Sequence, residues 1–76
     1  MTLIAGATGF LGGEICRRLA GSGESVRGLV RATSDQVAVQ RLQALGVETV
    51  VGDVRDRPSL DAACRGVRTV VSTVTT

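Results

Sequence analysis

Four short apolar segments alternate along the chain with three segments in which apolar residues recur at helical spacing. The first apolar segment, residues 2–5, ends at a glycine, and a run of this length bounded by a turn residue is typical of a buried strand. Three later segments have the same character. We therefore predict strands at residues 2–5, 26–30, 47–51 and 68–74.

The segments between these strands carry amphipathic helical patterns. In the first, Leu11, Ile15 and Leu19 recur every fourth residue, which predicts that they form the core-facing stripe. The second begins at Ser34 and Asp35, both residue types that favour the N-cap of a helix. The remaining helical signals are Gly9, Gly21 and Gly23 around the first helix, Ala38, Leu42, Leu45 and Gly46 in the second, and Pro58, Leu60, Ala63, Cys64, Gly66 and Val67 in the third.

The resulting order, β-α-β-α-β-α-β with short connections, predicts the α/β class. Such alternation favours a Rossmann-type parallel sheet with helices on both faces and strand order 3-2-1-4. The fourth strand would then be an exposed edge rich in valine, which is a pairing liability. We therefore expect residues 1–76 to be the N-terminal part of a larger domain, with the substrate-binding region absent. A missing C-terminal half or a homo-oligomer would cover that edge.

Three glycines follow the first predicted strand at regular spacing. Gly6 would turn the chain off the strand, Gly9 would let a pyrophosphate approach the backbone, and Gly12 would let the helix pack closely on the sheet. The amides and the dipole of the first helical turn would face the phosphates. The alternative is a glycine-rich turn without a ligand. A P-loop is excluded because no lysine follows the glycines.

The stretch Gly-Ala-Thr-Gly-Phe-Leu-Gly at residues 6–12, after the strand Thr-Leu-Ile-Ala, resembles a known family. It is similar to the extended and atypical short-chain dehydrogenase/reductase superfamily, and within it to NmrA-like and isoflavone-reductase-like NAD(P)H-binding proteins. The resemblance extends through residues 52–54 and 70–72. It implies a Rossmann fold that binds a dinucleotide, with Thr8, Phe10 and Leu11 joining the glycines at the cofactor.

The choice of dinucleotide depends on Arg31, at the tip of the second predicted strand. NAD sites usually carry a carboxylate there for the ribose 2′-OH, whereas a guanidinium forms charge-assisted bonds with a 2′-phosphate. The sequence therefore predicts NADP(H) in preference to NAD(H), although a solvated surface arginine is the alternative. Thr33 and Ser34 could add hydroxyl bonds to the same phosphate, and helix capping is the competing role for Ser34.

The resemblance implies further cofactor contacts at the ends of the third and fourth strands. Asp53 would meet the adenine amino group and Val54 would pack beside the ring, whereas a turn-forming role is the alternative for Asp53. Ser72 and Thr73 would lie under the ribose, or serve simply as polar residues at a strand end. The predicted cofactor-binding residues are Gly6, Thr8, Gly9, Phe10, Leu11, Gly12, Arg31, Asp53, Val54 and Ser72.

Composition removes several other function classes. The formal net charge is +2, from nine arginines scattered along the chain, and a single phenylalanine supplies the aromatic content. Without clustered basic residues and aromatic stacking partners, nucleic-acid binding is not expected. No apolar run approaches the length of a membrane span, so we expect no membrane association and a cytoplasmic protein. Cys16 and Cys64 lack the spacing of a metal site or a disulfide framework.

Catalytic residues are not expected in this segment. The chain contains no tyrosine, lysine or histidine, and the resemblance places the Tyr-x-x-x-Lys pair of carbonyl-reducing members further downstream. Three hypotheses follow: the cofactor-binding part of an NADP-dependent reductase or epimerase-like protein, an NmrA-like redox-sensing regulator without turnover, and a truncated inactive fragment.

Overall fold

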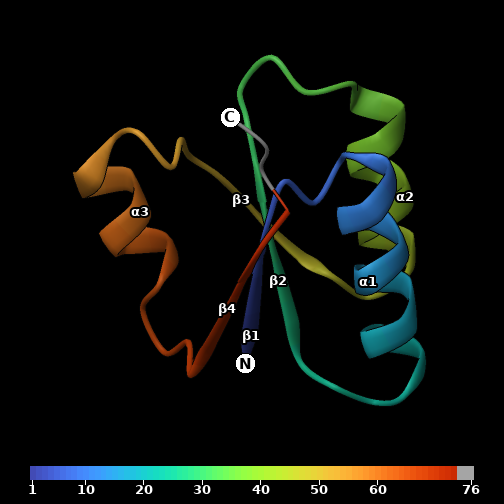
Figure 1. Ribbon diagram of the computed structural model, residues 1–76. Coiled ribbons are helices and arrows are strands. Elements are labelled where there is room, and N and C mark those ends of the chain that lie inside the picture. The colour runs from blue at the N-terminus through green and yellow to red at the C-terminus, as the bar shows by residue number, and fades with distance from the viewer. Residues whose placement is uncertain (74–76) are drawn as a thin grey trace.

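A computed structural model of the chain describes residues 1–73 as a four-stranded parallel sheet with three helices (Figure 1). The strands lie side by side in the order β3-β2-β1-β4. This confirms the predicted α/β class, the strand order and the alternation of elements. The elements in chain order are β1 (Thr2–Ala5), α1 (Phe10–Gly21), β2 (Val26–Val30), α2 (Gln36–Ala44), β3 (Glu48–Val51), α3 (Arg57–Ala63) and β4 (Thr69–Ser72).

Helices cover both faces of the sheet, with α1 and α2 on one side and α3 on the other (Figure 1). Because successive side chains of a strand point to opposite faces, β1 contributes to two cores. Ile4 packs with Cys16 and Leu42 under α1 and α2. Leu3 and Ala5 belong to the second core, under α3. The two-sided burial explains why β1 is apolar at every position after Thr2.

The buried face of α1 is shifted by one residue from the predicted stripe that begins at Leu11. Gly12 and Cys16 are the buried residues of this helix, whereas the side chain of Leu11 is 59% exposed. Ile15 and Leu19 still pack against the core as half-buried residues. The close approach of Gly12 to the sheet turns the helix so that Leu11 lies at its rim. The expectation that Leu11 faces the core was therefore wrong.

The helix termini agree with the sequence signals in most respects. Asp35 is the N-cap of α2, and its carboxylate accepts a hydrogen bond of 3.0 Å from the Val37 amide. Ser34 does not cap this helix, because its hydroxyl oxygen accepts from the Arg31 amide at 2.9 Å. The third helix ends at Ala63, before Gly66 and Val67, although Val67 still packs against the α3 core. Val74, predicted to end the fourth strand, lies outside the described residues.

The exposed edges of the sheet are β3 and β4. Val70 of β4 is 52% exposed, and Val51 of β3 is 66% exposed.

Both cysteines are free thiols. Within residues 1–73, no helix combines the length and the apolar character needed to cross a membrane.

Candidate functional site

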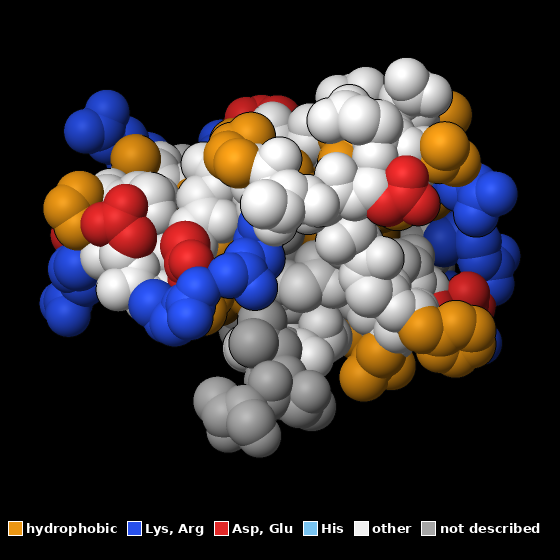
Figure 2. Space-filling model, turned by 90° about the horizontal axis from the view of Figure 1, so that it is seen from above, with side chains coloured by type: hydrophobic (Ala, Val, Ile, Leu, Met, Phe, Trp, Pro, Cys, Tyr) orange, Lys and Arg blue, Asp and Glu red, His pale blue; other side chains and the backbone are white. Residues whose placement is uncertain are grey.

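All four strands run in the same direction, so their carboxyl ends meet at one edge of the sheet, at the top of Figure 1. Seen from above in Figure 2, this edge presents adjoining acidic and basic side chains beside a largely uncharged surface. In open α/β sheets, ligands bind outside the carboxyl ends of the strands. The predicted site residues come from this edge, from the loops that leave it and from the first turn of α1.

The loop between β1 and α1 is built by its glycines. Gly6 has a φ of 79°, in the left-handed region that side chains rarely adopt, and so turns the chain sharply off β1. The Gly9 amide donates to the Gly6 carbonyl at 3.0 Å, and the Gly13 amide donates to the Gly9 carbonyl at 2.8 Å. Gly9 is thus both the closing residue of a tight turn and the N-cap of α1.

Gly12 brings the first turn of α1 against the end of β1. A Cβ atom at Gly12 would collide with the carbonyl group of Gly6, and would lie 3.0 Å from Oγ1 of Thr73. The role predicted for Gly12 in close helix–sheet packing is therefore seen directly.

Thr73 holds this loop from the opposite side. Its hydroxyl donates to the carbonyl oxygen of Ala5 at 2.8 Å and lies 3.3 Å from that of Gly6, and its amide also donates to Ala5. The sequence interpretation placed Thr73 under a ribose and missed this anchoring role. A threonine immediately after the fourth strand was the only signal for it.

The first turn of α1 contains backbone amides that the fold itself leaves unused. A helix leaves its first amides without intrahelical partners. Within residues 1–73, the amides of Phe10, Leu11 and Gly12 have no acceptor. The hydrogen bonds inside the loop are donated by the amides of Gly9 and Gly13. The Phe10 side chain is 96% exposed and projects into solvent. The loop therefore offers unpaired donors and the positive end of a helix dipole.

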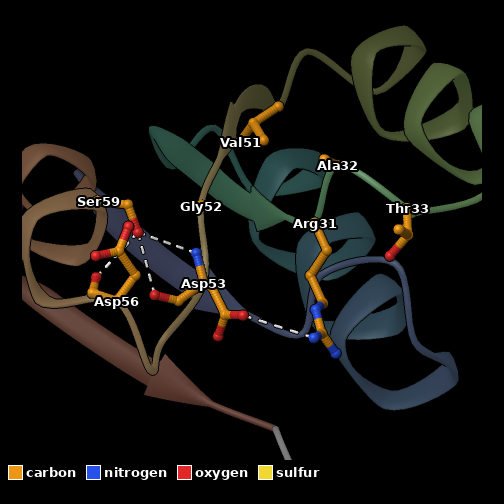
Figure 3. Close-up of a pocket in the computed structure, with 8 residues that line it drawn as sticks. All are labelled: Arg31, Ala32, Thr33, Val51, Gly52, Asp53, Asp56 and Ser59. Carbon is orange, nitrogen blue, oxygen red and sulfur yellow. Dashed lines mark hydrogen bonds and ion pairs between the residues drawn. The ribbon is translucent and has the colours of Figure 1, made fainter.

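A second part of the site is a pocket of about 380 Å³ between the ends of β2 and β3 (Figure 3). Arg31 and Thr33 approach it from the loop after β2, and Asp53 from the loop after β3. The full lining consists of Arg31, Ala32, Thr33, Val51, Gly52, Asp53, Asp56 and Ser59.

The side chains of Arg31 and Asp53 point toward each other across this pocket, and their charged groups lie 3.5 Å apart (Figure 3). Arg55 holds the same carboxylate more closely, through guanidinium contacts of 2.9 and 3.2 Å and an amide hydrogen bond of 2.9 Å. Chiefly because of these hydrogen bonds from Arg55, the pKa of Asp53 falls to about 2. The carboxylate therefore stays ionised under all ordinary conditions.

The Asp53 turn is fastened to α3 by Ser59. Its hydroxyl oxygen accepts from the Asp53 amide at 3.1 Å and lies 3.1 and 3.0 Å from the carbonyl oxygens of Asp53 and Asp56. Gly52 makes the approach possible, because a Cβ there would lie 2.9 Å from Leu29 and 3.2 Å from the Ser59 hydroxyl. The turn-forming role weighed for Asp53 is thus present in the structure. Ser59 was not predicted.

The remaining predicted residues divide between other positions of the same edge. Thr8, Gly9 and Phe10 line a second hollow of about 280 Å³, which Arg17, Arg41 and Leu45 border from the helices. Val54 is 38% exposed and follows Asp53 in the turn. Ser72 ends β4 in register with Ala5. Neither Val54 nor Ser72 lines either hollow.

Known proteins resemble this chain in both sequence and structure. Sterol demethylase protein B of Methylococcus capsulatus is 44% identical over 72 residues, which are 95% of this chain and 21% of that protein. The NADPH complex of leucoanthocyanidin reductase from Vitis vinifera matches with a TM-score of 0.86 and 25% identity, over 97% of this chain and 26% of that one.

An NAD-bound UDP-glucose-4-epimerase from Stenotrophomonas maltophila matches with a TM-score of 0.83 and 26% identity, over 99% of this chain and 24% of that one. The chain thus spans about a fifth to a quarter of the length of these proteins. Over residues 1–76, the sequence matches the profile of the NmrA-like family. The chain belongs to the NmrA-like family of Rossmann-type proteins.

Proposed function

We propose that this chain is the N-terminal, cofactor-binding part of an NAD(P)-dependent reductase or epimerase-like protein, and that it binds NADP(H) in preference to NAD(H). The observation that carries the proposal is the β1–α1 loop, where the amides at the start of α1 have no acceptor within residues 1–73 and the glycines have no side chains. Its relatives include proteins whose structures hold NADPH and NAD. A cytoplasmic location belongs to the same proposal.

The diphosphate of the cofactor would lie against the start of α1. The amides of Phe10, Leu11 and Gly12 would donate to its oxygens, with the helix dipole adding to the attraction. Gly9 permits this approach because it has no side chain between the backbone and the ligand. Gly6 and Thr8 would complete the loop around the phosphates, and Ser72, at the end of the adjacent strand, would lie under a ribose.

The adenosine end would occupy the pocket between β2 and β3. Asp53 retains acceptor capacity beyond its bonds to Arg55, because a carboxylate offers about four lone-pair sites. It would accept from the adenine amino group, and Val54, partly exposed beside it, would pack on the ring.

Arg31 would select the phosphorylated cofactor. Its side chain is 62% exposed and bonded only loosely to Asp53, so it can turn to a 2′-phosphate at small cost. A charge-assisted hydrogen bond contributes about 1.5–3 kcal/mol, which corresponds to roughly ten- to a hundredfold in affinity. The hydroxyl of Thr33, on the same pocket wall, would add a further donor.

Chemistry on a substrate would depend on residues outside this segment. The chain lacks tyrosine, lysine and histidine, and its acidic residues at the carboxyl edge are used in ion pairs and turns. What this segment supplies is binding and orientation of the cofactor. When bound, NADP(H) would supply the hydride chemistry.

Thermal unfolding of the purified chain in buffer, NADH and NADPH tests this function. A ligand that binds only the folded state raises the midpoint by an amount that grows with the ratio of its concentration to its dissociation constant. We expect NADPH to raise the midpoint more than NADH at equal concentration. No shift with either cofactor would contradict dinucleotide binding, and equal shifts would contradict the preference alone.

A further inference from the structure

One carboxylate in the proposed site is shared by two arginines. Asp53 lies between Arg55, which reaches both of its oxygens at 3.2 and 2.9 Å, and Arg31, whose guanidinium is 3.5 Å away. The Arg55 contact is shorter and two-pronged, and it is reinforced by the Arg55 amide at 2.9 Å. Asp53 is therefore bound chiefly by Arg55 and only weakly by Arg31.

This arrangement matters because a 2′-phosphate would compete with Asp53 for Arg31. Both groups are anions, and each would repel the other if the carboxylate were left without a counter-ion. Arg31 and Arg55 together balance Asp53 and Asp56 at this pocket, whereas without Arg55 the two carboxylates would outnumber the single remaining cation. Because Asp53 is ionised at neutral pH, its negative charge is always present to compete with the 2′-phosphate for Arg31.

We propose that Arg55 is a specificity-determining residue that acts through Asp53: by holding the carboxylate, it leaves Arg31 available for the 2′-phosphate of NADP(H). The inference rests on the function proposed above and names the group that regulates its selectivity. Arg55 is a positioning residue in this account, because it touches Asp53 and not the cofactor. NADH, which lacks the phosphate, should be indifferent to it.

The other ion pairs in the described part of the chain are arranged differently. Glu14 is also shared by two arginines, Arg17 and Arg18, but all three residues lie on α1. Arg57 pairs with Asp61 at 3.6 Å along α3, and Arg27 of β2 pairs with Glu48 of β3 at 3.1 Å without a second arginine. In the described part of the chain, Asp53 is the acid that joins an arginine from the end of β2 to one from its own loop.

A double-mutant cycle separates the roles of these groups. Arg55→Met, Asp53→Asn and the double variant would be titrated with NADPH and NADH by isothermal calorimetry. Arg57→Met is the control, because it removes the same charge two residues further along the chain, where Arg57 pairs with Asp61. We expect Arg55→Met to weaken NADPH binding by about three- to tenfold, the range expected for one partly screened charge. NADH affinity should stay the same. Adding Asp53→Asn should restore NADPH binding, because the competing anion is gone and the amide oxygen still accepts a hydrogen bond.

Three results would contradict the inference. Unchanged NADPH affinity in Arg55→Met would show that Arg55 does not govern Arg31, and failure of Asp53→Asn to restore binding would show that Arg55 meets the phosphate itself. An equal loss of NADPH affinity in Arg57→Met would show that only the net charge of the chain matters. Failure of the underlying function is separately visible, because the unmodified chain would then bind NADPH no better than NADH.

Discussion

Gly12 lies so close to the carbonyl group of Gly6 that no side-chain atom fits between them. The contact joins the first turn of α1 to the first residue of the glycine loop, and it sets both the rotation of the helix and the direction of its amides. Leu11 is placed at the rim and Cys16 in the core as a result. Packing and the proposed ligand-binding geometry therefore depend on the same contact.

Replacing Gly12 with alanine should destabilise the fold, because the new methyl group would displace either the loop or the helix. Overpacking of this kind costs about 1–3 kcal/mol in the free energy of unfolding. Urea unfolding followed by circular dichroism would measure the loss. Gly21→Ala is the matched control, since a Cβ there meets nothing within 4 Å. Equal stability of the two variants would show that the Gly12 contact is not restrictive.

Gly9→Val should abolish binding of both cofactors while the helical signal in circular dichroism remains. The backbone of Gly9 has φ −74° and ψ 169°, which any residue adopts, and a Cβ would lie 3.3 Å from the Gly6 oxygen. The larger effect is therefore obstruction of the proposed ligand position. Calorimetric titration would measure the affinity, with Gly21→Val as a control at the other end of α1. Retained affinity in Gly9→Val would remove the loop from the binding site.

Arg31→Met should reduce NADPH affinity at least tenfold and leave NADH affinity within twofold, because the lost charge-assisted bonds reach only the 2′-phosphate. Fluorescence titration of both reduced cofactors would measure the two affinities. Arg68→Met provides the comparison, because Arg68 lies at the amino end of β4, where its amide bonds to Met1. Equal losses for NADPH and NADH would assign Arg31 a general role in place of a selective one.

Thr73→Val should lower the free energy of unfolding by about 1 kcal/mol, the usual net contribution of one hydrogen bond. The substitution keeps the side-chain volume but removes the hydroxyl that binds the Ala5 carbonyl at 2.8 Å. Thr73→Ser, which keeps the hydroxyl, should be closer to the unmodified chain in urea unfolding. If valine were tolerated better than serine, the methyl group and not the hydroxyl would anchor the loop.

The Asp53 carboxyl should titrate with a midpoint near 2, well below its ordinary 3.8. Since the pKa is lower in the folded chain, the contribution of Asp53 to stability is complete above about pH 4 and is lost as the pH falls toward 2. Carboxyl carbon shifts in a pH titration by NMR would give the midpoint. Arg55→Met should raise it, because Arg55 is the main cause of the depression. A midpoint near 4 in the unmodified chain would show that the Arg55 pair does not persist in solution.

Much of the fold followed from local signals. The alternating apolar runs and helical spacing predicted every element, because buried parallel strands and amphipathic helices have distinct periods. The register of α1 was not predictable from its leucines, since the deciding contact joins Gly12 to Gly6 through space. Ser34 had two plausible partners, and only the path of the chain after β2 brings its hydroxyl to the Arg31 amide.

The candidate site was predicted less completely than the fold. The glycine loop and the place of Arg31 could be predicted, because each directly follows one strand that the apolar pattern marks. Arg55 and Ser59 were missed, because their importance comes from a turn that places them around Asp53. No pattern of hydrophobicity marks such a turn, and arginine and serine are common at exposed positions.

Dinucleotide binding by this chain depends, in our proposal, on the amides that open α1, which would receive the diphosphate. Amide resonances in a titration of the purified chain with NADPH test it most directly. We expect the largest shifts at Phe10, Leu11 and Gly12, with smaller ones at Arg31 and Asp53. If saturating NADPH left the resonances of residues 9–13 unmoved, or shifted only residues away from the carboxyl edge of the sheet, the claim would be contradicted.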